Sequence, residues 1–139
     1  MKHQYPTVKQ YRISSKFGTR IHPISKKESY HNGVDIACPT GTALKNTVST
    51  AICTKVGFDN RNGHYLRLEH DNGLLTSYAH LSKVIAKEGA EIDLGEVFAL
   101  TGNTGASTGA HLHFRVRELV NGVYIDVNPE DYFAYDSPL

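Results

Sequence analysis

The stretch HYLRLEHDNGLLTSYAH, residues 64–80, predicts two antiparallel β-strands joined by a tight turn. HYLRLEH (64–70) and LLTSYAH (74–80) are short strand-like runs, and Asp71-Asn72-Gly73 lies between them. Asparagine and glycine tolerate the positive φ angles that tight hairpin turns require. This stretch therefore sets the expectation of an antiparallel β fold.

The same pattern of short strands and turns extends over the rest of the chain. Further turns are expected at residues 60–63 and 121–122. Further strand-like runs are STAICTKV (49–56), VFALT (97–101) and HLHFRVREL (111–119). Short strands separated by such turns are typical of an antiparallel β-sandwich or a barrel-like sheet.

A helical stripe over a dozen residues is not evident in the sequence, although residues 81–88 could form a turn or two of helix. We therefore predict an all-β fold. The 139 residues are expected to form one domain with a core of about residues 12–133, because this length is enough to bury a core. The tail after Phe133 is expected to be loosely attached.

The composition argues against two classes of partner. The 15 Lys and Arg residues nearly balance the 14 Asp and Glu residues, and no basic stripe is visible, so nucleic acid is not expected as a partner. No apolar run approaches the roughly 20 residues that a membrane span needs. The N-terminal residues also lack the apolar segment of a secretory signal peptide.

Cys38 and Cys53 are too few for a cysteine metal site, and they are read as two buried thiols, with a disulfide as the alternative.

The run HLHFRVR (111–117) places polar and apolar side chains on opposite faces of a strand. At a period of two, His111, His113, Arg115 and Arg117 share one face, while the residues between them face the core. Two adjacent imidazoles repel each other when protonated, so a metal ion, a shared proton or a substrate group is expected between them.

A second candidate is HNGVD (31–35), in which His31 and Asp35 lie four residues apart and can face one ion. Together with one histidine of the HLH pair, they would supply three ligands of the kinds that zinc prefers, with the fourth position left for water. His80 and the other HLH imidazole would then lie beside the ion, where they could take or give a proton.

The order of the motifs resembles that of the lysostaphin-type (LytM-like) zinc metallopeptidases, which cut the peptide part of bacterial peptidoglycan. The resemblance runs from about Phe17 to Tyr132. Its motifs are FGTRIHP (17–23), HNGVDIACPTGT (31–42), NGHYLRLEHDNGLLTSYAHL (62–81) and TGNTGASTGAHLHFRVR (101–117). The resemblance implies a small antiparallel β fold whose groove is walled by loops. It also implies action outside the cytoplasm, in the periplasm or cell wall, as a secreted protein, or as part of a virion.

The resemblance also implies a role for each histidine of the candidate site. His31, Asp35 and His113 match the zinc ligands. His111 and His80 match the two histidines that do not bind the metal but assist the attacking water and the oxyanion. Cys38 departs from the family's usual small residue and is expected near the site.

The remaining candidates surround this site. Arg20, His22 and Tyr78 are predicted to contact substrate, with core or groove wall as the other reading of Tyr78, and a tyrosine that assists the oxyanion is sought among Tyr11, Tyr30 and Tyr78. His70 is expected in a turn, and His3 is expected to be disordered.

The leading hypothesis is a monomeric zinc endopeptidase that hydrolyses stem peptides or cross-bridges of peptidoglycan. The alternative is a non-catalytic module of the same fold that binds the cell wall or activates a hydrolase. Such modules lose metal ligands, whereas this chain keeps all three together with both accessory histidines. The FGTRIHP opening resembles members that cut stem or cross-link bonds more than those that cut glycyl-glycine bonds.

Overall fold

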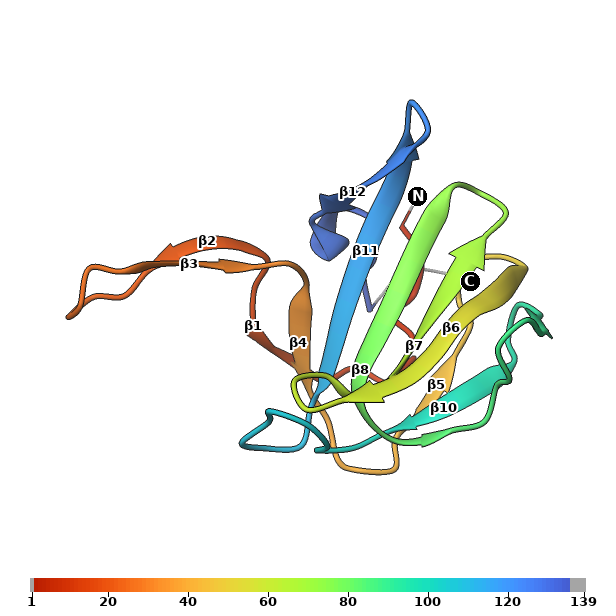
Figure 1. The fold of residues 1–139 in the computed structure, drawn as a ribbon, viewed down its shortest axis with the longest axis horizontal. Helices are drawn as coiled ribbons and strands as arrows, with labels where there is room; N and C mark the ends of the chain where they lie inside the picture. The colour runs from red at the N-terminus through yellow and green to blue at the C-terminus, as the bar shows by residue number, and fades with distance from the viewer. Residues whose placement is uncertain (1, 136–139) are drawn as a thin grey trace.

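The computed structural model describes residues 2–135, which form antiparallel strands and one short 3₁₀ turn (Figure 1). The strands are β1 (Arg12–Ser15), β2 (Gly18–Ile21), β3 (Glu28–His31), β4 (Val34–Ala37), β5 (Ala43–Lys45), β6 (Ala51–Asp59), β7 (Gly63–His70), β8 (Leu74–Val84), β9 (Glu91–Ile92), β10 (Val97–Thr101), β11 (Leu112–Val120) and β12 (Val123–Val127). The 3₁₀ turn is η1 (Pro129–Asp131). The predicted all-β class is confirmed.

The main sheet has the strand order β1-β4-β11-β8-β7-β6-β9. β12 pairs with β11, and β10 pairs with both β8 and β5. β2 and β3 form a separate hairpin that projects away from this sheet (Figure 1). The hairpin predicted from residues 64–80 is confirmed as β7 and β8, and Gly73 in its turn has a φ of 89°.

The strand that carries the two adjacent histidines separates its side chains as the sequence predicts. Leu112, Phe114 and Val116 of β11 are fully buried in the core. Phe114 packs against Phe133 and Tyr78, with ring centroids 4.9 and 5.4 Å apart. Burial of these side chains fixes the position of β11, and with it the polar side chains on its other face.

β8 runs further than its sequence pattern indicates. The helical turn considered for residues 81–88 is absent, because β8 continues as a strand to Val84. It pairs with β11 as far as Ala79 and with β10 from Leu81 onward. His80 lies between these two pairings, at the point where the strand changes partners.

His70 is the last residue of β7, directly before the turn, as the strand-like run 64–70 predicts, and its side chain is buried. Its Nδ1–H donates to the Ser49 carbonyl at 3.0 Å, and its Nε2 lies 2.8 Å from Thr76 Oγ1. Thr76 Oγ1 in turn accepts a hydrogen bond of 2.8 Å from the Tyr78 hydroxyl. In a neutral His70 with its proton on Nδ1, Nε2 can accept a hydrogen bond from the Thr76 hydroxyl and complete this chain.

The ends of the described chain pack together. His3, which was predicted to be disordered, forms a parallel bridge with Phe133, and their rings lie 5.6 Å apart. Tyr135 forms a 2.7 Å hydrogen bond with Thr7. The chain is thus held beyond Phe133, although residues 136–139 of the predicted loose tail lie outside the described part.

Two further expectations concern cysteines and membranes. Cys38 and Cys53 are buried free thiols, as the first reading predicts. None of the helices within residues 2–135 is long and apolar enough to cross a membrane.

Gly33 is required where the chain turns between β3 and β4. A Cβ atom at this position would overlap the backbone carbonyl of Phe114 in β11. We predict that Gly33→Ala lowers the free energy of unfolding by about 1–3 kcal/mol, the usual cost of overpacking. Gly109→Ala is the matched control, because a Cβ there meets open space. Urea unfolding of both variants measures the difference, and equal stability would contradict the predicted clash.

His70 predicts a pH dependence of stability. Burial lowers the pKa of His70, and repulsion from His3 acts in the same direction, whereas Asp71 opposes it. The unfolded chain therefore binds this proton near pH 6.5, and the folded protein binds it only at lower pH. The free energy of unfolding is expected to fall between pH 7.5 and 5, and to fall less steeply in His70→Gln. Denaturant titrations at pH 7.5 and pH 5 measure how much the free energy of unfolding changes in each protein. An equal change in His70→Gln and in the unmodified protein would refute the role of His70.

Candidate metal and catalytic site

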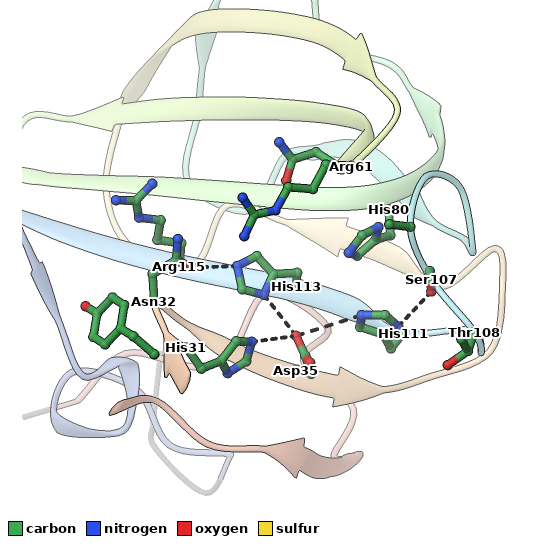
Figure 2. Close-up of a pocket in the computed structure, with 13 residues that line it drawn as sticks. His31, Asn32, Asp35, Arg61, His80, Ser107, Thr108, His111, His113 and Arg115 are labelled. Carbon is green, nitrogen blue, oxygen red and sulfur yellow. Dashed lines mark hydrogen bonds and ion pairs between the residues drawn. The ribbon is translucent and has the colours of Figure 1, made fainter. Parts of the chain in front are cut away.

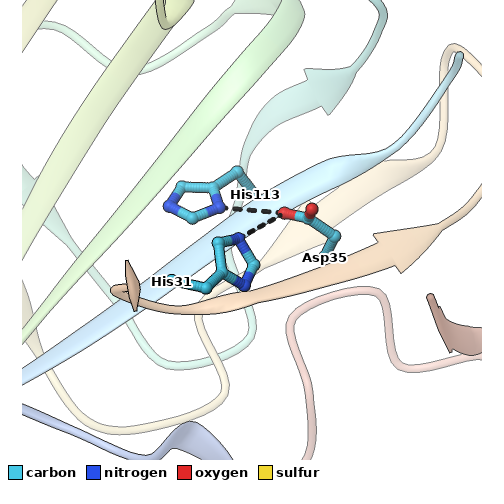
Figure 3. A group of neighbouring side chains, drawn as sticks. All are labelled: His31, Asp35 and His113. Carbon is cyan, nitrogen blue, oxygen red and sulfur yellow. Dashed lines mark hydrogen bonds and ion pairs between the residues drawn. The ribbon is translucent and has the colours of Figure 1, made fainter. Parts of the chain in front are cut away.

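His31, Asp35 and His113 bring three potential ligand atoms together on the open face of the sheet (Figure 3). Asp35 in β4 and His113 in β11 are direct partners in the ladder, so their side chains share a face. His31 ends β3 and reaches the same point from the hairpin. Asp35 Oδ1 lies 2.9 Å from His113 Nδ1 and 3.3 Å from His31 Nε2.

The other ring nitrogens of these two histidines are held by acceptors outside the cluster. His31 Nδ1–H donates to the Lys16 carbonyl at 3.0 Å. His113 Nε2–H donates to Asn32 Oδ1 at 2.8 Å. These bonds turn the lone pairs of the remaining nitrogens toward Asp35, an arrangement typical of histidines that bind metals.

This geometry requires a positive charge between the three groups. Two imidazole lone pairs and an ionised carboxylate repel one another unless protons or a metal ion lie between them. Zinc is bound by nitrogen and oxygen ligands of these kinds. The residues present therefore fit a zinc ion, with His31 Nε2, Asp35 Oδ1 and His113 Nδ1 as the atoms that could hold it.

His80 and His111 lie next to this cluster, with their rings 4.7 Å apart (Figure 2). His80 Nδ1–H donates to the Thr104 carbonyl at 2.8 Å. His111 Nδ1–H donates to the Gly109 carbonyl at 2.8 Å, and Ser107 lies 3.1 Å from the same nitrogen. His111 Nε2 lies 3.8 Å from Asp35 Oδ1, which is farther than the corresponding nitrogens of His113 and His31 at 2.9 and 3.3 Å.

His80 adopts an unusual backbone conformation. Its φ of 64° lies in the left-handed region, which few residues other than glycine occupy. Its backbone N–H donates to the Asn62 carbonyl at 2.7 Å, and its ring is held by Thr104. Hydrogen bonds that His80 donates to carbonyls of two loops thus hold this strained residue at the site, as is common for functional side chains.

The protonation behaviour of the cluster follows from these contacts. Burial raises the pKa of Asp35, but hydrogen bonds from His113 and His31 outweigh it, and the net shift is strongly downward. The bond to Asp35 raises the pKa of His31. Burial lowers the pKa of His80, and repulsion from His111 and His113 adds to this, although the Thr104 bond opposes it.

The cluster lies in an open cleft of about 490 Å³. Arg61 and Asn62, from the loop between β6 and β7, form one side, and Ser107 and Thr108 lie on the loop before β11 (Figure 2). Tyr30 also lines this cleft, and its hydroxyl donates to Asp126 at 3.2 Å. The three cluster residues and the neighbouring His80 and His111 all line this cleft, so one bound molecule could contact all five.

The three side chains predicted to contact substrate lie elsewhere. Arg20 and His22 are exposed on or beside the β2–β3 hairpin and do not line the cleft. Arg20 donates to Ser15 at 2.6 Å, and His22 Nδ1 accepts hydrogen bonds from two backbone N–H groups of its own turn. For Tyr78 the reading as a core residue is confirmed and the predicted substrate contact is not supported: Tyr78 is 2% exposed, since its ring packs on Phe98 and its hydroxyl donates to Thr76.

Asn32 was not singled out from the sequence. Its carboxamide orients His113, yet it belongs to the HNGVD stretch that also supplies His31 and Asp35. The position of Asn32 directly after the ligand candidate His31 is the sequence feature that could have indicated its role. Cys38, expected near the site, is buried in contact with Thr101 and the backbone of Leu112.

Residues 29–127 match the sequence model of Peptidase family M23, which covers more than half of the chain and includes the whole cluster. The chain belongs to Peptidase family M23. The peptidoglycan DD-endopeptidase ShyA of Vibrio cholerae is 38% identical over 114 residues, which are 81% of this chain and 26% of that protein. This chain spans less than a third of the length of ShyA and of two other curated relatives that it matches.

Solved structures give the same family fold. A zinc-containing peptidase from Vibrio cholerae superposes with a TM-score of 0.78 at 35% identity, covering 93% of this chain and 39% of that one. The catalytic domain of lysostaphin from Staphylococcus simulans superposes with a TM-score of 0.73 at 28% identity, covering 90% of this chain and 95% of that one. The resemblance to lysostaphin-type peptidases is therefore confirmed.

Proposed function

We propose that this M23 domain is a zinc-dependent endopeptidase that hydrolyses peptide bonds in bacterial peptidoglycan. The observation that supports this most directly is the convergence of one ligand atom from each of His31, Asp35 and His113, all within 4.8 Å of one another. The M23 relative ShyA is named as a peptidoglycan DD-endopeptidase, and a structural neighbour is named as a zinc-containing peptidase. Since peptidoglycan lies outside the cytoplasm, we propose that the domain acts there, as a single catalytic unit and as a monomer.

We assign His31, Asp35 and His113 as the zinc ligands. Bound zinc would polarise the scissile carbonyl and lower the pKa of a water molecule toward neutrality. Asn32 and the Lys16 carbonyl are positioning groups, because they fix the ring orientations of His113 and His31.

We assign His80 and His111 as catalytic residues that exchange protons with the reacting groups. In both rings a backbone carbonyl holds Nδ1–H, so Nε2 is the nitrogen available on the side of the cleft. One imidazole would accept the proton of the attacking water, and the other would donate a hydrogen bond to the developing oxyanion. Arg20 and His22, on the projecting hairpin, remain predictions for contacts with a long polymer.

The first test concerns metal content. His31→Ala, Asp35→Ala and His113→Ala are expected to lose zinc, whereas His80→Ala and His111→Ala keep one zinc per chain. Asn32→Ala is expected to weaken zinc binding by about 10- to 100-fold, as for other groups that orient a metal ligand. Metal analysis and competition with a chelator measure these changes. Equal loss of zinc in the His80 and His111 variants would contradict the assigned roles.

The second test concerns activity. Zinc-loaded protein is expected to release peptide fragments from purified peptidoglycan, and a chelator abolishes this release. His80→Ala and His111→Ala should lower turnover by about 100-fold or more, the usual contribution of a general acid or base. Mass spectrometry of the fragments identifies the cleaved bond. If a folded, zinc-loaded sample cleaves no peptidoglycan of any bridge chemistry, a binding or activating module becomes the better description.

A further inference from the structure

Three arginines lie on the same face of the sheet as the metal cluster, beyond His113. Arg115 and Arg117 follow His113 at intervals of two along β11, so they share its face. Arg115 lies opposite Ser77 of β8, and Ser77 lies opposite Arg67 of β7. Arg115, Ser77 and Arg67 therefore form one row across three adjacent strands.

Among the described residues, a carboxylate neutralises only the Arg115 guanidinium. Arg115 forms a two-point contact with Asp126, with distances of 2.7 and 3.1 Å. Within residues 2–135, neither Arg67 nor Arg117 has a carboxylate oxygen within 4.0 Å. The Arg67 guanidinium lies 5.8 Å from the centre of the Tyr65 ring.

Arg117 has unused hydrogen-bonding capacity. Its Nη2 reaches Ser77 Oγ only at 3.5 Å, and its Nε is buried without an acceptor among the described residues. Burial lowers the pKa of Arg117, and repulsion from Arg115 and Arg67 adds to this, since the three positive charges lie close together. An anion placed here would satisfy the donors and reduce the repulsion.

The arginine row is open to the cleft. A small groove of about 60 Å³ is lined by Arg67, Ser77 and Arg115. Arg117 does not line this groove, but its Nη2 lies 3.5 Å from the Oγ of Ser77, which does. It shares Asn32, Asn62, His113 and Arg115 with the cleft that holds the metal cluster. A peptide bound at the cluster could therefore continue over this row without leaving the surface.

We propose that Arg67 and Arg117 form a subsite for a free carboxylate of the peptide substrate, on the sheet face beyond His113. This inference rests on the proposed endopeptidase function and narrows its substrate class. At roughly 3.3 Å per strand residue, Arg115 and Arg117 lie about 7 and 13 Å along β11 from His113. An extended peptide covers this span in about two to four residues, so the carboxylate lies within that distance of the cleaved bond. Cross-links that carry acidic residues fit this subsite, and bridges made only of glycine do not.

The test uses two cross-linked peptidoglycan peptides that differ only in whether their free carboxylates are intact or amidated. The zinc-loaded protein is compared with Arg67→Gln and Arg117→Gln. Arg12→Gln serves as the control, because Arg12 is exposed on β1, which pairs with β4 and not with β7, β8 or β11. Thermal melting of each variant verifies that it folds.

The protein is expected to cleave the peptide with intact carboxylates with the higher kcat/KM. In Arg67→Gln and Arg117→Gln this value should fall by about 10- to 100-fold, mainly through KM, as for the loss of a hydrogen bond to a charged group. For the amidated peptide, kcat/KM should change by less than about threefold in these variants, because this peptide has no free carboxylate for the arginines to bind. The control should match the unmodified protein on both peptides.

Two outcomes separate the subsite from the proposed function. If both peptides are cleaved equally well, and the variants lower both rates alike, the subsite is refuted and the endopeptidase function stands. If neither peptide is cleaved, titration calorimetry with the same two peptides decides the question. Carboxylate-dependent binding that Arg67→Gln weakens would support the subsite, and equal binding of both peptides would overturn it.

Discussion

The contact between Asp35 and His113 is the interaction on which the rest of the site depends. Because β4 and β11 pair in register at these residues, the backbone ladder itself places a carboxylate oxygen 2.9 Å from an imidazole nitrogen. The other face of β11 is fixed by Leu112 and Phe114, which are completely buried. Burial of that apolar face therefore determines where the ligand atoms lie, and no movement of a long loop is needed to bring them together.

Backbone carbonyl groups and one carboxamide then orient the rings. Each of the four histidines in the cleft donates one N–H to an acceptor outside the cluster, and its other nitrogen is left for chemistry. Three of these acceptors are main-chain oxygens, whose positions are fixed by the strands and turns that carry them. Such fixed partners lower the cost of ordering the site when a metal or substrate binds.

Much of the fold and the cluster could be predicted from the sequence. The period of two around His113 identified its buried and exposed faces, and the Asp71–Gly73 turn identified the β7–β8 hairpin. Side chains whose environment depends on distant strands could not be placed in this way. Tyr78 belongs to β8, which is buried on both faces over much of its length, so alternation carries no information there. His3 is ordered only because it meets Phe133 from the other end of the chain.

The assignment of His31, Asp35 and His113 as zinc ligands is tested most directly by X-ray diffraction, at the zinc absorption edge, from crystals of the zinc-loaded protein. The expected result is one anomalous peak within about 2.0–2.2 Å of His31 Nε2, Asp35 Oδ1 and His113 Nδ1, with His80 and His111 outside this distance. A zinc ion bound by His80 or His111, or an ion that does not contact Asp35, would contradict the account.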